Sequence, residues 1–180
     1  MGECLQIMDH GKMERTLKRM ACEIVEAHKS TDNLALIGVH TRGVFLAHRL
    51  QQYIKTFEGV ELPIGEIDIT LYRDDWTQMS PQPVVKTTNI TFSVDNKQII
   101  LVDDVLFSGR TVRAAMDQVI DFGRPARIEL AVLVDRGHRE LPIQSNYSGQ
   151  IIKTKRSEMI NVFLQESDGE DKVTLAKMQI

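Results

Sequence analysis

The sequence predicts an α/β fold in which a central, mostly parallel sheet is flanked by helices. Residues 34–40, 99–102 and 128–134 are short, continuously apolar runs, which are typical of strands buried on both faces of a sheet. Residues 44–56 and 111–122 lie between these runs and are expected to be helices. Because strands and helices alternate along the chain, the pattern favours right-handed βαβ units.

The first strong element is a helix over residues 10–29. At helical pitch its apolar side chains share one face, and a basic stripe occupies the opposite face. The apolar face consists of Met13, Leu17, Met20, Ala21 and Ile24, together with His28.

Three further segments complete the expected fold. Residues 63–72 alternate in part and predict a strand, whereas residues 73–88 have no period, and loops of that length are often lids. Residues 159–165 and 172–178 flank Asp168 and Gly169, a pattern that predicts a C-terminal β-hairpin.

Length and composition indicate one domain that spans residues 1–180. Hydrophobic residues make up 42% and charged residues 26%, and the net charge is −3, so any nucleic-acid binding needs a local basic patch. Cys4 and Cys22 have neither the spacing of a zinc site nor that of a disulfide scaffold. The first residues lack the apolar core of a signal peptide. We therefore expect a cytoplasmic protein without membrane association.

Residues 99–111 carry the chemistry. An apolar strand ends in Asp103 and Asp104, and a turn with Ser108, Gly109, Arg110 and Thr111 opens the next helix. Backbone N–H groups at such a helix start favour a phosphate, while the two carboxylates suit ribose hydroxyls and a nearby magnesium ion. A capped helix without a ligand is the structural alternative, which the paired acids disfavour.

This stretch resembles the phosphoribosyl pyrophosphate motif of type I phosphoribosyltransferases. Over nearly the whole chain the sequence is similar to the PyrR family, whose members combine attenuation of pyrimidine operons with uracil phosphoribosyltransferase activity. The residues that carry the resemblance are 40–43, 65–75, 99–111, 121–125 and 130–143. The resemblance implies a type I phosphoribosyltransferase fold with a small hood over the base, formed by the segment that begins near residue 144.

By resemblance, Asp103 and Asp104 hold the ribose hydroxyls and bind Mg²⁺ directly or indirectly. The loop from Val105, Leu106 and Phe107 to Thr111 takes the 5′-phosphate, and Thr41, Arg42 and Gly43 take the pyrophosphate. Arg73, on the expected lid, is a further catalytic candidate, although its sequence neighbours Asp74 and Asp75 also make a simple ion-pair role plausible. These implied roles make Asp103, Asp104, Arg42 and Arg73 the catalytic set.

For the base, the resemblance implies contacts from Phe107, Val134, Asp135 and Tyr147. Six-oxopurine members of the superfamily place an Asp at the position of Phe107, to exchange a proton with the ring. Phe lacks that function, and the PyrR family usually has Tyr there, so uracil is favoured over hypoxanthine and guanine. The alternative is that Phe107 merely packs the turn.

For RNA, the resemblance implies a basic face with Lys18, Arg19, His138, Arg139 and Lys155. The chain departs from the family at Cys22, Ala27 and Gln144, where the family often has His, Arg and Arg. Each missing cation removes one interaction with a phosphate, so a solvated charged face is an equal alternative.

The expected ligands are therefore phosphoribosyl pyrophosphate, uracil and UMP, together with a pyrimidine-operon leader RNA. The other functions kept open are a transferase without an RNA role and a nucleotide-sensing regulator with little turnover. A homo-oligomer is also expected, with an apolar helix face near residues 44–53 as its dimer surface.

Overall fold

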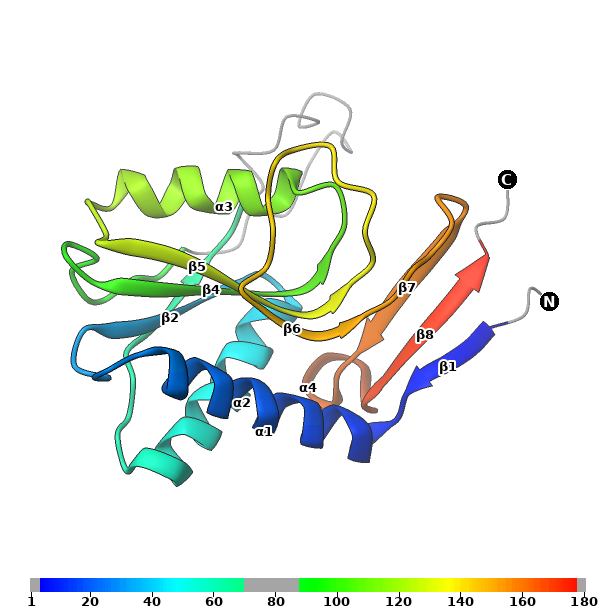
Figure 1. Ribbon diagram of the computed structural model, residues 1–180, viewed down its shortest axis with the longest axis horizontal. Coiled ribbons are helices and arrows are strands. Elements are labelled where there is room, and N and C mark those ends of the chain that lie inside the picture. The colour runs from blue at the N-terminus through cyan, green and yellow to red at the C-terminus, as the bar shows by residue number, and fades with distance from the viewer. Residues whose placement is uncertain (1–3, 70–87, 178–180) are drawn as a thin grey trace.

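The computed structural model describes residues 4–69 and 88–177 (Figure 1). Its central sheet has five parallel strands in the order β3-β2-β4-β5-β6. The strands are β2 (Leu34–Val39), β3 (Ile64–Ile67), β4 (Gln98–Leu106), β5 (Arg127–Asp135) and β6 (Tyr147–Ile151). The predicted α/β fold is confirmed.

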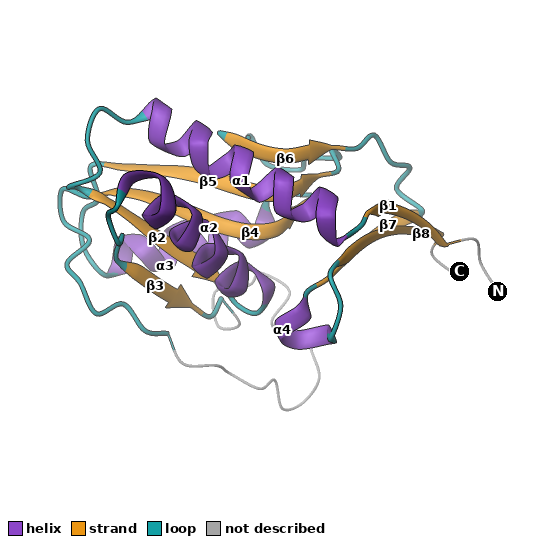
Figure 2. Cartoon of the chain, turned by 90° about the horizontal axis from the view of Figure 1, so that it is seen from below, coloured by secondary structure: helices purple, strands orange, loops and turns teal. Residues whose placement is uncertain are grey.

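Helices cover both faces of this sheet. α1 (His10–Ala27) and α2 (Arg42–Glu58) pack on one face, and α3 (Arg110–Asp121) packs on the other (Figure 2). Successive residues of the strands point to opposite faces of the sheet. Leu36 and Ile100 lie under α1 and α2, whereas Ile37 and Leu101 lie under α3. A strand buried on both faces in this way has an unbroken apolar sequence.

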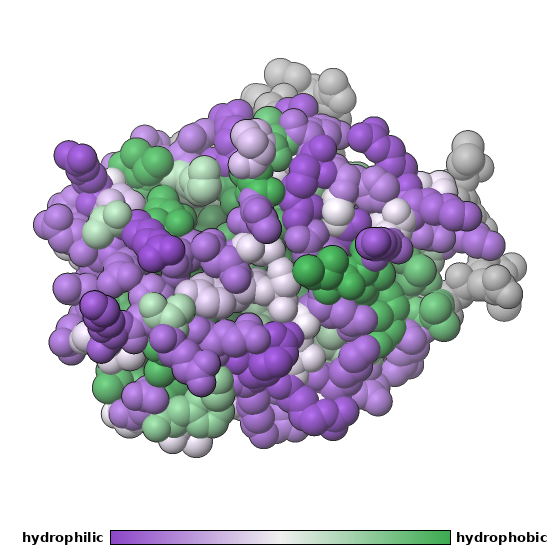
Figure 3. Space-filling view, in the orientation of Figure 1, coloured by the Kyte–Doolittle hydropathy of each residue, from purple (hydrophilic) through white to green (hydrophobic). Residues whose placement is uncertain are grey.

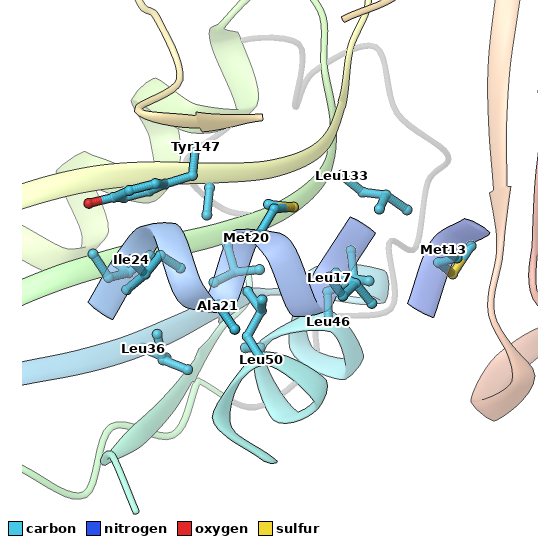
Figure 4. Close-up of a cluster of buried hydrophobic side chains, with 14 of the residues drawn as sticks. Met13, Leu17, Met20, Ala21, Ile24, Leu36, Leu46, Leu50, Leu133 and Tyr147 are labelled. Atoms are coloured by element: carbon cyan, nitrogen blue, oxygen red, sulfur yellow. The ribbon is translucent and has the colours of Figure 1, made fainter. Parts of the chain in front are cut away.

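The predicted apolar face of the first helix is buried in full. Met13, Leu17, Met20, Ala21 and Ile24 are each at most 1% exposed and pack against α2 and the sheet (Figure 4). Asp9 caps the helix, because its carboxylate accepts the Lys12 N–H at 2.7 Å.

The same core covers part of the helix face that was expected to form a dimer surface. Val44, Leu46 and Leu50 are at most 5% exposed, and Leu46 and Leu50 belong to the core under α1. Phe45 and Tyr53 of α2 are only partly buried. The buried residues are thus not available to a second copy, and the dimer surface and the oligomeric state stay predictions.

A small second sheet lies at the end of α1 and combines both ends of the chain (Figure 1). The expected hairpin is present as β7 (Glu158–Phe163) and β8 (Lys172–Lys177), which pair antiparallel. Two details differ from the prediction. The connection contains a short helix, α4 (Gln165–Asp168), and an unpredicted strand, β1 (Cys4–Met8), pairs with the other edge of β8.

The surface seen in Figure 3 is mostly hydrophilic, with small hydrophobic areas between the polar residues. Among the described residues no helix combines the length and the apolar character needed to cross a membrane. Most of the expected lid, residues 73–87, lies outside the described ranges, and so does Arg73.

Candidate active site

Two strand-to-helix turns meet at the carboxyl ends of β2 and β4. At the first turn, a Cβ on Gly43 would lie 2.4 Å from the carbonyl oxygen of Val102 and 3.2 Å from Cα of Asp103. The start of α2 is therefore pressed against β4 where its acids begin. This closeness places Arg42, the first residue of α2, beside the two carboxylates, at the edge where open α/β sheets bind ligands.

Asp103 and Asp104 lie inside β4, which continues four residues beyond the predicted apolar run and ends at Leu106. Burial, and then the charge of Asp104, raise the pKa of Asp103 well above its usual range. Burial also raises the pKa of Asp104, against the opposing effects of the Val105 N–H and the Arg42 charge. Two adjacent buried acids of this kind are stabilised by a cation or by hydroxyl donors.

The donor set suits a magnesium ion that is shared with a substrate. Carboxylate oxygens are ligands that Mg²⁺ prefers, and the ion commonly takes one or two carboxylates together with substrate phosphates and water. In residues 4–69 and 88–177 no group of three or more His, Cys, Asp or Glu side chains is arranged to hold a metal. Asp103 and Asp104 therefore fit such an ion as a partial site that a ligand completes.

The second turn, after β4, has the features of an anion site. Gly109 adopts the left-handed conformation with φ of 91°, which glycine tolerates best, and α3 begins at Arg110. Gly109, the N-cap residue, has no side chain to cap this helix, and the first turn contains no acidic residue. The Arg110 N–H donates to the Ser108 hydroxyl at 3.3 Å. The helix dipole favours a phosphate at this end of α3, where no acidic side chain opposes it.

The loop between β5 and β6 packs across this turn. The N–H groups of Glu140 and Leu141 donate to the carbonyl oxygen of Ser108 at 2.9 and 3.2 Å. The Glu140 carboxylate also accepts from Nε of Arg110 at 2.8 Å. The second turn, residues 107–110, is called the phosphate turn from here on. It and the loop between β5 and β6 hold each other in position.

A pocket of about 660 Å³ opens beside the phosphate turn, between residues 135–139 and 151–154. The Arg136 guanidinium, which belongs to the pocket wall, lies 4.2 Å from the centroid of the Phe107 ring. His138 meets the same ring edge-on at 6.0 Å. The pocket is the best candidate for the base, because it adjoins the phosphate turn and Phe107.

Arg136 is the functional candidate that sequence reasoning missed. Its side chain is buried, and its Nη2 donates to the carbonyl oxygens of Lys155 and Glu158 at 3.3 and 2.5 Å. Burial lowers its pKa. Its position within the family-specific string 130–143 was the only signal in the sequence, and that string does not reveal that the side chain turns toward Phe107.

Asp135 lines the pocket, but protein donors already occupy its carboxylate. Its Oδ1 accepts the Gly137 N–H at 3.0 Å, and its Oδ2 accepts from Arg139 and, at 3.4 Å, from the Ser145 hydroxyl. Although burial opposes the shift, these donors hold the pKa of Asp135 below its usual range. Asp135 therefore orders the loop between β5 and β6, which borders the pocket and is called the pocket loop. Few of its lone pairs remain free to accept a hydrogen bond from a base.

Tyr147 and Val134, expected at the base, lie elsewhere. Tyr147 pairs in register with Ala131, four residues before Asp135, and its ring points into the core beside α1 (Figure 4). Its hydroxyl donates to Glu129 at 3.0 Å, far along the sheet from the pocket wall. Val134 is fully buried in the same core. The physical reason is the register of β6, which the sequence pattern does not specify.

The residues expected to bind RNA are spread over α1 and the pocket loop. Lys18 forms an exposed pair with Glu14 at 2.6 Å, and Arg19 reaches across to the Gly149 carbonyl oxygen of β6 at 2.5 Å. Lys155 is exposed between β6 and β7. These three cations remain accessible from solvent.

His138 and Arg139 are committed to the pocket loop instead. His138 Nε2 lies 2.6 Å from the Thr154 carbonyl oxygen. Arg139 donates to the carbonyl oxygens of Phe107 and Ile143 at 2.9 and 3.0 Å and pairs with Asp135. The structure therefore gives Arg139 a role in holding the loop, which makes it a poor probe of RNA binding.

Known proteins with similar sequences point to one family. A family model described as a phosphoribosyl transferase domain matches residues 4–166. The chain is 56% identical to the "Bifunctional protein PyrR" of Thermus thermophilus over 170 residues, 94% of each chain. It is 51% identical to the protein of that name from Clostridioides difficile, over 97% of this chain and 99% of the relative.

Solved structures with a similar fold belong to the same superfamily. A hypoxanthine phosphoribosyltransferase of Trypanosoma cruzi matches with a TM-score of 0.73 over 97% of both chains, at 15% identity. A hypoxanthine-guanine phosphoribosyltransferase of Bacillus anthracis matches with a TM-score of 0.69 over 99% of both chains, at 16% identity. At these identities the likeness confirms the type I phosphoribosyltransferase fold alone.

Proposed function

The chain belongs to the PyrR family of phosphoribosyltransferases, and from this premise we propose how its site carries out the reaction. The protein transfers the phosphoribosyl group from phosphoribosyl pyrophosphate to uracil, which forms UMP and pyrophosphate, and it regulates pyrimidine operons. The 5′-phosphate binds at the start of α3, the ribose hydroxyls at Asp103 and Asp104, and the pyrophosphate at Thr41, Arg42 and Gly43.

The observation that carries this assignment is the contact of the first turn with β4 at the point where the two acids begin. The Gly43 backbone touches the Val102 carbonyl and Asp103, so a pyrophosphate at the first turn and a ribose at the acids are neighbours. These are the groups that one phosphoribosyl pyrophosphate molecule joins. Any side chain at position 43 would collide with the Val102 carbonyl and push the first turn away from the acids.

The reaction breaks the bond between the anomeric carbon and the pyrophosphate oxygen and forms a bond to the uracil nitrogen, whose proton is released together with pyrophosphate. Positive charge builds on the ribose, and negative charge builds on the departing pyrophosphate. The protein contributes orientation, through the two turns, and a positive guanidinium at Arg42. Magnesium, when bound at Asp103 and Asp104, supplies further positive charge to the leaving group.

Base choice follows from Phe107 and the pocket beside it. Phe107 has no group that exchanges a proton with a purine ring, and Arg136 holds the ring in place at 4.2 Å. Steady-state assays of the purified protein with uracil, hypoxanthine and guanine test the assignment. We expect the highest specificity constant for uracil; a higher value for guanine contradicts it.

The RNA partner of the regulatory activity binds, in our proposal, on the accessible cations Lys18, Arg19 and Lys155. None of the three belongs to the residues assigned to the phosphates, so in this proposal RNA and substrate bind at the same time. The alternative of a transferase without an RNA role is kept because Cys22, Ala27 and Gln144 replace basic positions of the family.

A further inference from the structure

Arg42 is held by a carboxylate that comes from the small sheet. Its Nη2 donates to Oδ1 of Asp168, in α4, at 2.9 Å. The two residues lie 126 positions apart in the chain. The pair joins the pyrophosphate turn of the central sheet to the connection between β7 and β8.

Asp168 is itself fixed before it meets Arg42. Its Oδ2 accepts the Leu164 N–H at 2.9 Å and the Ser167 hydroxyl at 2.7 Å, which leaves Oδ1 for the guanidinium. The Leu164 N–H is the main cause that lowers the pKa of Asp168. Asp168 is therefore a carboxylate with one oriented oxygen, rather than a mobile surface charge.

A separate contact anchors α4 to α2. Arg49 donates to both carboxylate oxygens of Glu166 at 2.8 and 2.6 Å, and to both oxygens of Asp171 at 3.0 and 2.7 Å. This cluster fixes the position of α4 without Asp168. The attachment of the two elements and the orientation of Arg42 are thus carried by different side chains.

We propose that Asp168 is a positioning residue that holds the Arg42 guanidinium ready for the pyrophosphate of the substrate. The inference rests on the proposed role of Arg42. Asp168 engages only Nη2, so other N–H groups of the guanidinium stay available for phosphate oxygens. Arg42 Nε, which is buried, also has no hydrogen-bond partner among the described residues.

The energetic benefit is pre-organisation. A free arginine side chain carries substantial rotamer entropy, part of which is lost when it binds phosphate. A side chain that is already oriented loses less on binding. The accompanying reduction in positive charge is small, because the ion pair is single and partly exposed, with side-chain exposures of 35% and 20%.

The test compares full-length Asp168→Asn with Glu170→Gln, which removes a carboxylate from the same connection between β7 and β8 but touches neither Arg42 nor Arg49. For Asp168→Asn we expect the KM for phosphoribosyl pyrophosphate and the inhibition constant of pyrophosphate to rise about fivefold. The KM for uracil and kcat should stay within about twofold. Glu170→Gln should leave all four constants near those of the wild type.

A double-mutant comparison separates positioning from a general structural role. In an Arg42→Met background, Asp168→Asn should cause no further rise in the KM for phosphoribosyl pyrophosphate. An unchanged or lowered KM in the single Asp168→Asn variant overturns the inference, as does an equal loss in the Arg42→Met background. If the wild type itself does not use phosphoribosyl pyrophosphate, the proposed function fails instead.

Discussion

The Arg136 guanidinium lies over the ring of Phe107 at 4.2 Å, and the same arginine donates to the backbone of the segment between β6 and β7. One side chain therefore joins the phosphate turn to the far wall of the base pocket. A cation over an aromatic ring contributes about 1 kcal/mol at a partly buried site.

The first prediction concerns this contact. Phe107→Leu keeps an apolar side chain but removes the ring, so the KM for uracil should rise about fivefold. The KM for phosphoribosyl pyrophosphate should not change, because the phosphate turn is held by Glu140 and Leu141. Phe107→Tyr, which keeps the ring, serves as the control. Equal effects of Leu and Tyr on the KM for uracil would refute the role of the ring.

A second prediction tests the placement of Tyr147 in the core. Tyr147→Phe removes one hydrogen bond to buried Glu129 and should lower the free energy of unfolding by about 1–2 kcal/mol. The KM for uracil should stay at the wild-type value. Urea unfolding and steady-state kinetics measure the two quantities. An increase in the KM for uracil without a loss of stability would show instead that Tyr147 contacts the base.

The carboxylates around Arg49 predict a dependence of stability on pH. Hydrogen bonds from Arg49 are the main cause that lowers the pKa of Glu166. The pKa of Asp171 is lowered too, because donors from Arg49 and the Gln165 N–H outweigh its burial. A lowered carboxyl pKa stabilises the fold above the unfolded pKa of about 4, and this stability is lost as the pH falls through the folded pKa.

Arg49→Gln should therefore cost about 1–3 kcal/mol at pH 7, because it removes the guanidinium from buried Asp171 and from the more exposed Glu166. The difference from the wild type should shrink as the pH falls below about 4, where the carboxyl groups become protonated in the wild type as well. Urea unfolding midpoints measured between pH 3 and pH 7 show this convergence. A constant difference across that range would contradict the assignment.

RNA binding gives a fourth prediction. Replacing Lys18, Arg19 and Lys155 by Gln should lower the salt slope of binding to a pyrimidine-operon leader RNA by about one unit for each phosphate that the protein no longer neutralises. Arg113→Gln, on α3 at the opposite face of the sheet, is the control. UMP should tighten RNA binding in the wild type, as a nucleotide-responsive regulator requires, and RNA should then tighten UMP binding by the same factor.

Filter-binding titrations at several salt concentrations, with and without UMP, measure these effects. No binding of the leader RNA at low salt in either condition would leave the transferase-only alternative. A control variant whose salt slope falls as much as that of the triple variant would show that the three cations are not the RNA face.

The central sheet was predictable because its strands are apolar on both faces. Sequence reasoning ended the strand of the acids at Val102, where the apolar run stops. The structure continues β4 to Leu106, because its backbone keeps pairing with β5, as Asp103 does with Val132. Side-chain polarity thus locates the acids correctly but does not show where backbone pairing ends.

Contacts between distant segments were not predictable. β1 pairs with β8 across nearly the whole chain, as Gln6 does with Thr174, and its five residues have no strong local pattern. The ring of Tyr147 faces the core because of the register of β6, which depends on its pairing with β5. Arg42 and Asp168 likewise meet only through the fold.

The paired acids carry the central claim, that the end of β4 is the ribose and magnesium site of a phosphoribosyltransferase. The most direct measurement is UMP formation from uracil and phosphoribosyl pyrophosphate by the wild type and by Asp103→Asn/Asp104→Asn. The wild type should form UMP and pyrophosphate in equal amounts, and chelation of magnesium should stop it.

The double variant should keep the wild-type circular dichroism spectrum and lose at least about a hundredfold in kcat/KM. The double variant should stay folded. Burial raises the pKa of both acids, which means that the folded state favours their uncharged forms. Near-normal turnover by a folded double variant, with an unchanged KM for phosphoribosyl pyrophosphate, would contradict the account.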